Sequence, residues 1–124
     1  MRLITTMLAL LLASSGAWAE WMGVSKTDKA VFYIDPATIR KDGNLRKVWE
    51  VTDYRSRAEK GHLSFRSRKE YDCKLERFRF LSGSEHTGQM ATGETINSYD
   101  ASSPWFDIPP NSSSEHILKI VCDQ

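Results

Sequence analysis

Hydrophobic and polar residues alternate with a period of two over much of the chain, and this period predicts β-strands. The clearest run covers residues 62–73, where Phe65, Tyr71 and Cys73 fall on one face. Arg66 and Arg68 fall on the opposite face of the same run. We therefore predict a strand there with one apolar and one charged face.

Other segments carry the alternation, or the β-branched and aromatic residues, that are typical of strands. They are 21–25, 30–34, 45–54 and 77–81, with a weaker candidate at 90–99. Pro36 is expected to end the second of these strands, and Asp42-Gly43 is expected to form a hairpin turn. A bend or break is expected at 72–75, because an unbroken strand from 62 to 81 would be unusually long.

The last segment changes to a helical pattern. Ser112 and Glu115 have the spacing of a capping box, and an apolar stripe at helical spacing follows over 117–122. A strand over 117–122 is the competing interpretation, and the capping box favours the helix. The pattern predicts an α+β fold, with an antiparallel sheet of about five to six strands and a C-terminal helix packed on one face.

Residues 1–19 have the three parts of a secretion signal. Arg2 is the positive start, 3–13 is an apolar run, and Ala17-Trp18-Ala19 is a small-residue cleavage site. The run is too short to span a bilayer comfortably. We expect an exported, non-membrane-spanning chain that begins at Glu20, without an N-terminal lipid because no cysteine lies near the cut. The periplasm is the expected location, with secretion or the cell surface as alternatives, and residues 20–124 are expected to form a single domain.

The chain has two cysteines, Cys73 and Cys122. In an exported protein an even cysteine count indicates a disulfide. This bridge would tie the helix to the apolar face of the sheet. Both cysteines are then unavailable for zinc binding or thiol catalysis.

Charge is balanced overall but unevenly distributed. After removal of 1–19 the formal net charge is zero, which argues against a general nucleic-acid binder. Residues 20–80 carry 15 basic and 10 acidic side chains, whereas 81–124 carry one basic and six acidic side chains. The two halves either fold against each other with complementary surfaces, or the first half exposes a basic face to an acidic partner.

No catalytic motif stands out. His62, His86 and His116 have no second His or Cys at ligand spacing, and we expect them on the surface. The chain has no Gly-rich phosphate loop before a helix and no nucleophile elbow. We expect no metal, no cofactor and no enzymatic activity. A remote alternative is a small envelope hydrolase in which His62, Asp53 and Ser67 converge.

One set of basic residues is a candidate anion- or partner-binding face: Arg66, Arg68, Lys69, Arg77 and Arg79. Guanidinium groups recognise carboxylate, phosphate and sulfate groups well. The alternative is a solvated sheet face whose charges prevent aggregation.

Short motifs occur in a characteristic order along the mature chain. They are Trp21-Met22-Gly23-Val24, Val31-Phe32-Tyr33-Ile34-Asp35-Pro36-Ala37-Thr38-Ile39-Arg40, Lys47-Val48-Trp49, Tyr71-Asp72-Cys73, Pro104-Trp105, Ile108-Pro109-Pro110-Asn111-Ser112 and Val121-Cys122. With these motifs the chain resembles the bacterial surface-adhesin protein E-like family over nearly its whole mature length. The resemblance implies an antiparallel sheet tied to a C-terminal helix by the Cys73–Cys122 bridge. It also implies binding to host extracellular-matrix proteins, and dimerisation as a homodimer.

These observations lead to one main functional hypothesis. The chain is an exported, non-enzymatic binding domain of the bacterial envelope, whose partner is an unidentified envelope or host protein. The alternative is a secreted adhesin that binds matrix proteins through the basic sheet face.

Overall fold

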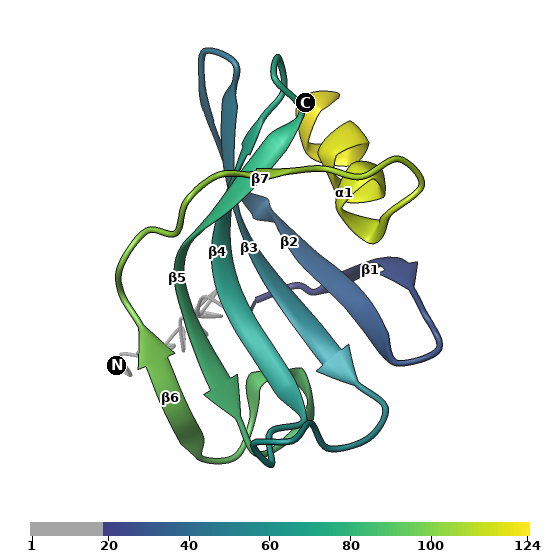
Figure 1. The fold of residues 1–124 in the computed structure, drawn as a ribbon, viewed down its shortest axis with the longest axis vertical. Coiled ribbons are helices and arrows are strands. Elements are labelled where there is room, and N and C mark those ends of the chain that lie inside the picture. The colour runs from purple at the N-terminus through teal and green to yellow at the C-terminus, as the bar shows by residue number, and fades with distance from the viewer. Residues whose placement is uncertain (1–18) are drawn as a thin grey trace, which may run out of the picture.

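The computed structural model describes residues 19–124, so most of the predicted signal segment lies outside the described residues. An antiparallel sheet runs through this part of the chain, with a 3-10 turn, η1 (Gln89–Ala91), and a C-terminal helix (Figure 1). The strands are β1 (Met22–Lys26), β2 (Ala30–Asp42), β3 (Leu45–Tyr54), β4 (Ser64–Asp72), β5 (Arg77–His86), β6 (Thr95–Tyr99) and β7 (Phe106–Asp107). The helix is α1 (Ser113–Cys122). The predicted fold class is confirmed, with β7 as a further, two-residue strand.

Strand order follows chain order from β1 to β6, and each neighbouring pair is antiparallel. β7 pairs with the start of β5 and carries the chain across the sheet toward the helix (Figure 1). The hairpin predicted at Asp42-Gly43 is present: Asp42 pairs with Leu45, and Gly43 has a φ of 57°. Glycine adopts this left-handed conformation without the strain that a side chain would add.

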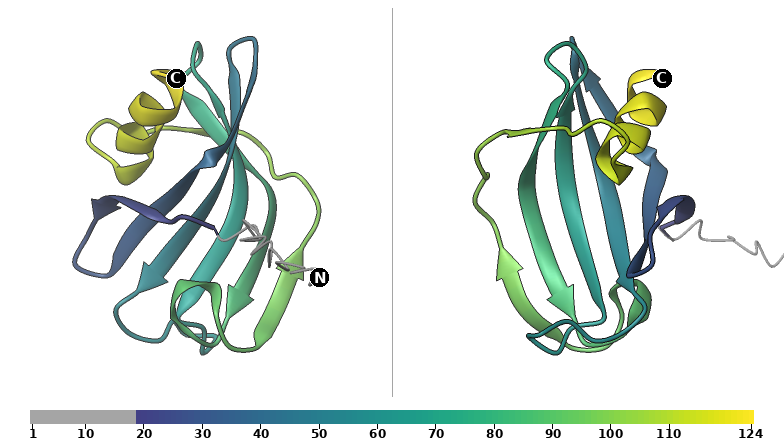
Figure 2. Two further views of the ribbon diagram at one scale, coloured as in Figure 1. Left: turned by 180° about the vertical axis from the view of Figure 1, so that it is seen from behind. Right: turned by 45° about the vertical axis from the view of Figure 1, so that its right-hand side comes forward.

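The helix covers one face of the sheet at the β1–β3 side, and Figure 2 shows it standing to one side of the curved strands. Ser112 is the N-cap, because its hydroxyl accepts a hydrogen bond from the backbone N–H of Glu115. The predicted helix is therefore confirmed, and the competing strand over 117–122 is wrong. The core that forms between helix and sheet contains Ile34, Val48, Tyr71, Ile117, Leu118 and Val121.

The predicted disulfide is also confirmed. Cys73 directly follows β4, and Cys122 is the last residue of α1. The two Cα atoms are 5.8 Å apart, and 49 positions of sequence separate them. The bond therefore fixes the C-terminal end of the helix to the β4–β5 turn.

Strands β2 and β5 both extend further than predicted. Pro36 does not end β2, because the chain forms an irregularity between Asp35 and Arg40 and then resumes pairing with β3. The Thr38 hydroxyl stabilises this irregularity by accepting from the Trp49 N–H and donating to the Asp35 carbonyl. β5 continues past Leu81 to His86, since it pairs with β4 on one side and with β6 on the other.

The strand expected within 90–99 is shorter than predicted. Met90 and Ala91 belong to η1 and have positive φ values of 54° and 59°. Their N–H groups donate to the Asp53 carboxylate and the Ser64 hydroxyl, which come from β3 and β4. These long-range hydrogen bonds hold a backbone conformation that local sequence does not favour.

Candidate functional site

The predicted arginine set is largely gathered on the sheet face that points away from the helix. Register places Arg66 and Arg68 across from Ser84 and Ser82, so alternation puts both on the same face. Arg77 and Arg79 occupy the same face on the adjoining half of β5, across from Asp72 and Glu70. We call the four residues Arg66, Arg68, Arg77 and Arg79 the arginine face.

Lys69 does not belong to the arginine face, and its inclusion in the predicted set is wrong. Its ammonium lies on the helix side of the sheet, 3.3 Å from the Glu50 carboxylate, and the residue is buried. The rings of Phe78 and Phe80 lie 4.6 Å and 5.2 Å from the same ammonium. A residue adjacent to Arg68 must point to the other face, because side chains alternate along a strand.

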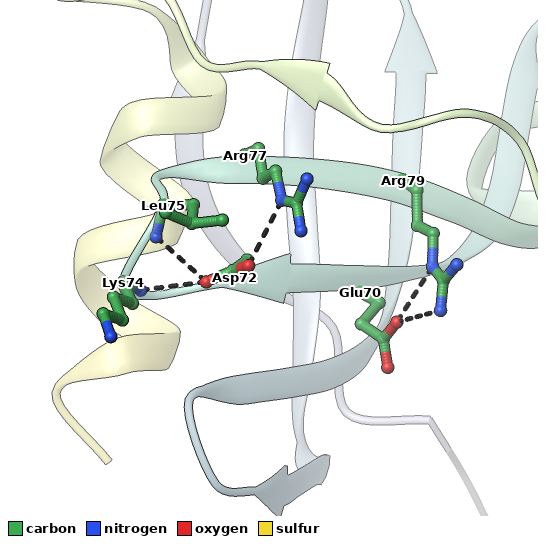
Figure 3. A network of polar contacts seen from close by, with 6 residues as sticks. All are labelled: Glu70, Asp72, Lys74, Leu75, Arg77 and Arg79. Atoms are coloured by element: carbon green, nitrogen blue, oxygen red, sulfur yellow. Dashed lines mark hydrogen bonds and ion pairs between the residues drawn. The ribbon is translucent and has the colours of Figure 1, made fainter.

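Two arginines of the face have carboxylate partners (Figure 3). Arg79 donates from Nε and Nη2 to one oxygen of Glu70, at 2.9 Å and 2.7 Å. Arg77 donates from Nε to Asp72 at 3.2 Å. The Trp105 ring lies 4.4 Å from the Arg77 guanidinium and 4.5 Å from that of Arg79. Arg77 and Arg79 are therefore each held within the fold by a carboxylate and by the Trp105 ring.

Asp72 also organises the β4–β5 turn. One of its carboxylate oxygens accepts from the backbone N–H groups of Lys74 and Leu75, while the other accepts from Arg77 (Figure 3). Burial alone would raise the pKa of Asp72, but these hydrogen bonds to the charged form outweigh it, and the pKa lies below its usual value. The ionised carboxylate is thus built into the turn that precedes Arg77.

Arg66 and Arg68 are in a different situation. No ion pair joins either of them to a carboxylate within residues 19–124. Arg66 lies over the Trp49 ring at 4.1 Å, and both arginines are partly exposed. Stacking on a ring restricts a guanidinium without consuming its donors. This half of the arginine face can therefore offer N–H donors to an anionic group from outside.

Two of the three histidines are not on the surface as predicted. His62 and His86 are buried, each with 9% exposure, and His116 is exposed. His86 Nε2 lies 2.7 Å from the Ser84 hydroxyl. Burial lowers the pKa of His86, and the nearby positive charge of Arg66 lowers that pKa further. His62 Nδ1 lies 3.9 Å from Glu85.

The three residues of the hydrolase alternative do not converge. Ser67 lies on the helix side of the sheet, across from Glu50, whereas Asp53 lies on the other face, across from Ser64. The Asp53 carboxylate is bonded to the N–H of Met90. The proposed arrangement of His62, Asp53 and Ser67 is therefore wrong.

Sequence reasoning missed the tryptophans of the arginine face. Trp49 lies in the predicted strand 45–54, and its register with Arg68 places it on the charged face. Trp105 reaches the arginines from the segment before β7. Alternation from the buried Val48 could have indicated the side on which Trp49 lies, but only the three-dimensional fold brings Trp105 to β5.

The fold and its charged face define a small disulfide-tied domain, with an antiparallel sheet that a C-terminal helix covers on one side. No helix among residues 19–124 is long and apolar enough to cross a membrane. The family model for surface-adhesin protein E matches residues 21–123. The chain therefore belongs to the surface-adhesin protein E family.

Solved structures of Haemophilus influenzae protein E share this fold. One is 13% identical with a TM-score of 0.61, and the match covers 86% of this chain and 86% of that chain. A second, in crystal form II, is 14% identical with a TM-score of 0.58, covering 81% of this chain and 91% of that one. Protein E from non-typeable Haemophilus influenzae is 13% identical with a TM-score of 0.61, and the match covers 88% of this chain and 79% of that chain. A comparison with curated protein sequences finds no match. At these identities the likeness shows the fold alone.

Proposed function

We propose that the chain is an exported, non-enzymatic binding domain whose arginine face binds an acidic surface of another protein. The observation that carries this proposal is the division of the face into two halves. Glu70 and Asp72 hold Arg79 and Arg77, while Arg66 and Arg68 keep donors free beside Trp49. Arginine and aromatic residues are both enriched at protein interfaces.

Family membership supports the class of function. The family name describes surface adhesins, and proteins of that kind act by binding a partner. A predicted signal segment places the mature domain outside the cytoplasm, where envelope and host proteins are both reachable. The partner is therefore an envelope protein or a host protein.

The adhesin alternative is favoured by the same family match. It requires the protein to reach the outside of the cell. Fractionation of the native protein separates the two versions, because a protein confined to the periplasm cannot hold a cell to a host matrix.

Capture from an envelope extract tests the proposal. The mature domain with its disulfide intact is immobilised and compared with the double variant Arg66→Glu/Arg68→Glu. Lys119→Glu is the matched control, since it reverses an exposed charge on α1. We expect a protein retained by wild type and by the control but not by the double variant. Equal retention by all three forms would exclude the arginine face.

A further inference from the structure

The two edges of the sheet differ in how they are covered. At one edge, β1 packs beside α1, and the Ser25 hydroxyl donates to that of Ser113. At the other edge, β6 pairs only with β5 among residues 19–124, and all residues of β6 are exposed. Its sequence, Thr-Ile-Asn-Ser-Tyr, has no lysine, arginine or proline. These are the residues that usually protect an open edge from pairing.

The backbone direction of β6 follows from its neighbour. The His86 carbonyl accepts from Leu63 on the β4 side. Backbone groups alternate along an antiparallel strand, so those of Glu85 and Gly83 point toward β6. Their partners Asn97 and Tyr99 point back toward β5, and the N–H and C=O of Ser98 point out of the sheet. An irregularity at Ile96 limits the regular part of this edge to Asn97–Tyr99.

An apolar recess lies beside this edge. After Tyr99 the chain separates from β5, and it rejoins β5 where the Ser103 N–H donates to the Phe80 carbonyl. The recess between them has a volume of about 220 Å³, and its lining is Phe65, Phe80, Ser82, Gly83, Tyr99, Ala101 and Ser103. Tyr99 is 45% exposed.

The charges around β6 indicate the charge of a segment that could pair with this edge. Glu94 and Asp100 directly flank the strand, and both are exposed. A second copy added at this edge would bring two acidic segments together, whereas a basic segment would be attracted.

We propose that β6 binds an extended basic segment of a partner protein as an added antiparallel strand. The segment exchanges backbone hydrogen bonds with Ser98 and packs one aromatic side chain against Tyr99 at the recess. Basic residues of the segment lie opposite Glu94 and Asp100. This surface is separate from the arginine face and takes a partner of the opposite charge.

A synthetic peptide tests this inference directly. The sequence Lys-Phe-Thr-Thr-Val-Thr-Lys places its first Thr opposite Ser98, Phe opposite Tyr99, and the two Lys residues opposite Asp100 and Glu94. We expect it to shift the backbone amide resonances of β6 in the mature domain. Replacing both Lys by Glu, Phe by Ala, or the first Thr by Pro should each weaken binding by about fivefold or more.

Protein variants complete the test. Ser98→Pro removes the outward N–H and should abolish the shifts, whereas Ser98→Ala keeps that N–H and should preserve them. Circular dichroism and thermal melting test whether Ser98→Pro remains folded. If it does not, Glu94→Lys/Asp100→Lys should weaken binding of the Lys peptide and favour the Glu peptide.

Equal binding of the Lys and Glu peptides, or shifts confined to the arginine face, would overturn the proposal. Concentration-dependent shifts of β6 without peptide would assign the edge to a second copy and also overturn it.

Discussion

The ammonium of Lys69 lies 3.3 Å from the carboxylate of Glu50, and both side chains are buried on the helix side of the sheet. The second oxygen of Glu50 accepts a hydrogen bond from the Tyr71 hydroxyl. Burial and the negative charge of Glu50 raise the pKa of Tyr71 well above its usual value, so the hydroxyl keeps its proton and donates. A charged network therefore borders the apolar core.

Removing Lys69 should be costly, because it leaves Glu50 buried without its cation. We expect Lys69→Met to lower the free energy of unfolding by about 3 kcal/mol. Arg68→Met is the matched control on the opposite face of the same strand, and it should cost less than about 1 kcal/mol. Urea denaturation of both variants measures the difference. A smaller loss for Lys69→Met than for Arg68→Met would contradict the assignment of the two faces.

The disulfide should stabilise the whole domain. In the chain-entropy model a loop of this length contributes about 3–4 kcal/mol, so Cys122→Ser should lower the melting temperature and loosen α1. The double variant Cys73→Ser/Cys122→Ser should have the same melting temperature as the single variant, because both lack the disulfide. Reduction of the wild type by a thiol provides a second route to the same state. Equal melting of the oxidised and reduced forms would show that the bond adds nothing.

Removing the Ser112 hydroxyl tests the helix cap. Ser112→Ala removes the acceptor for the Glu115 N–H and should cost about 1 kcal/mol. Ser114→Ala changes a serine in the first turn that makes no side-chain hydrogen bond within the described residues, so it should cost little. Thermal unfolding of the two variants separates capping from a general effect of serine removal.

Glu85 should make stability depend on acidity. Hydrogen bonds from Asn97 and then Tyr99 hold the pKa of Glu85 below its usual value of 4.5, although burial opposes them. A lowered folded-state pKa gives stability that is present above the unfolded value and lost as the pH falls through the folded value. The difference in unfolding free energy between wild type and Glu85→Gln should therefore shrink as the pH falls from about 5 toward 3. Denaturant titrations at several pH values measure it, and a difference independent of pH would contradict the role of Glu85.

The sequence predicted the strands and the helix whose bounds depend on neighbouring residues. The bounds of β3 follow from alternation between two turn signals, and the start of α1 follows from the Ser112 cap. The cysteine pair could be predicted because an exported chain with two cysteines has only one way to join them.

Contacts between distant segments explain the features that the sequence did not predict. Nothing near Met90 in the sequence indicates that Asp53 accepts from its N–H, and nothing near Lys69 points to Glu50. Alternation placed Lys69 on the apolar face, but the charge of its side chain suggested the arginine set. The alternation is correct for Lys69, and only the fold shows that the Glu50 carboxylate lies beside its ammonium.

We propose that Arg66 and Arg68 bind the acidic surface of the partner protein. The most direct measurement is the affinity of the captured partner for wild type, Arg66→Glu/Arg68→Glu and Lys119→Glu, at low and high salt. We expect the double variant to bind at least about tenfold more weakly, and wild-type binding to fall as salt rises. Unchanged affinity of the double variant, with the Lys119→Glu control also unchanged, would contradict it.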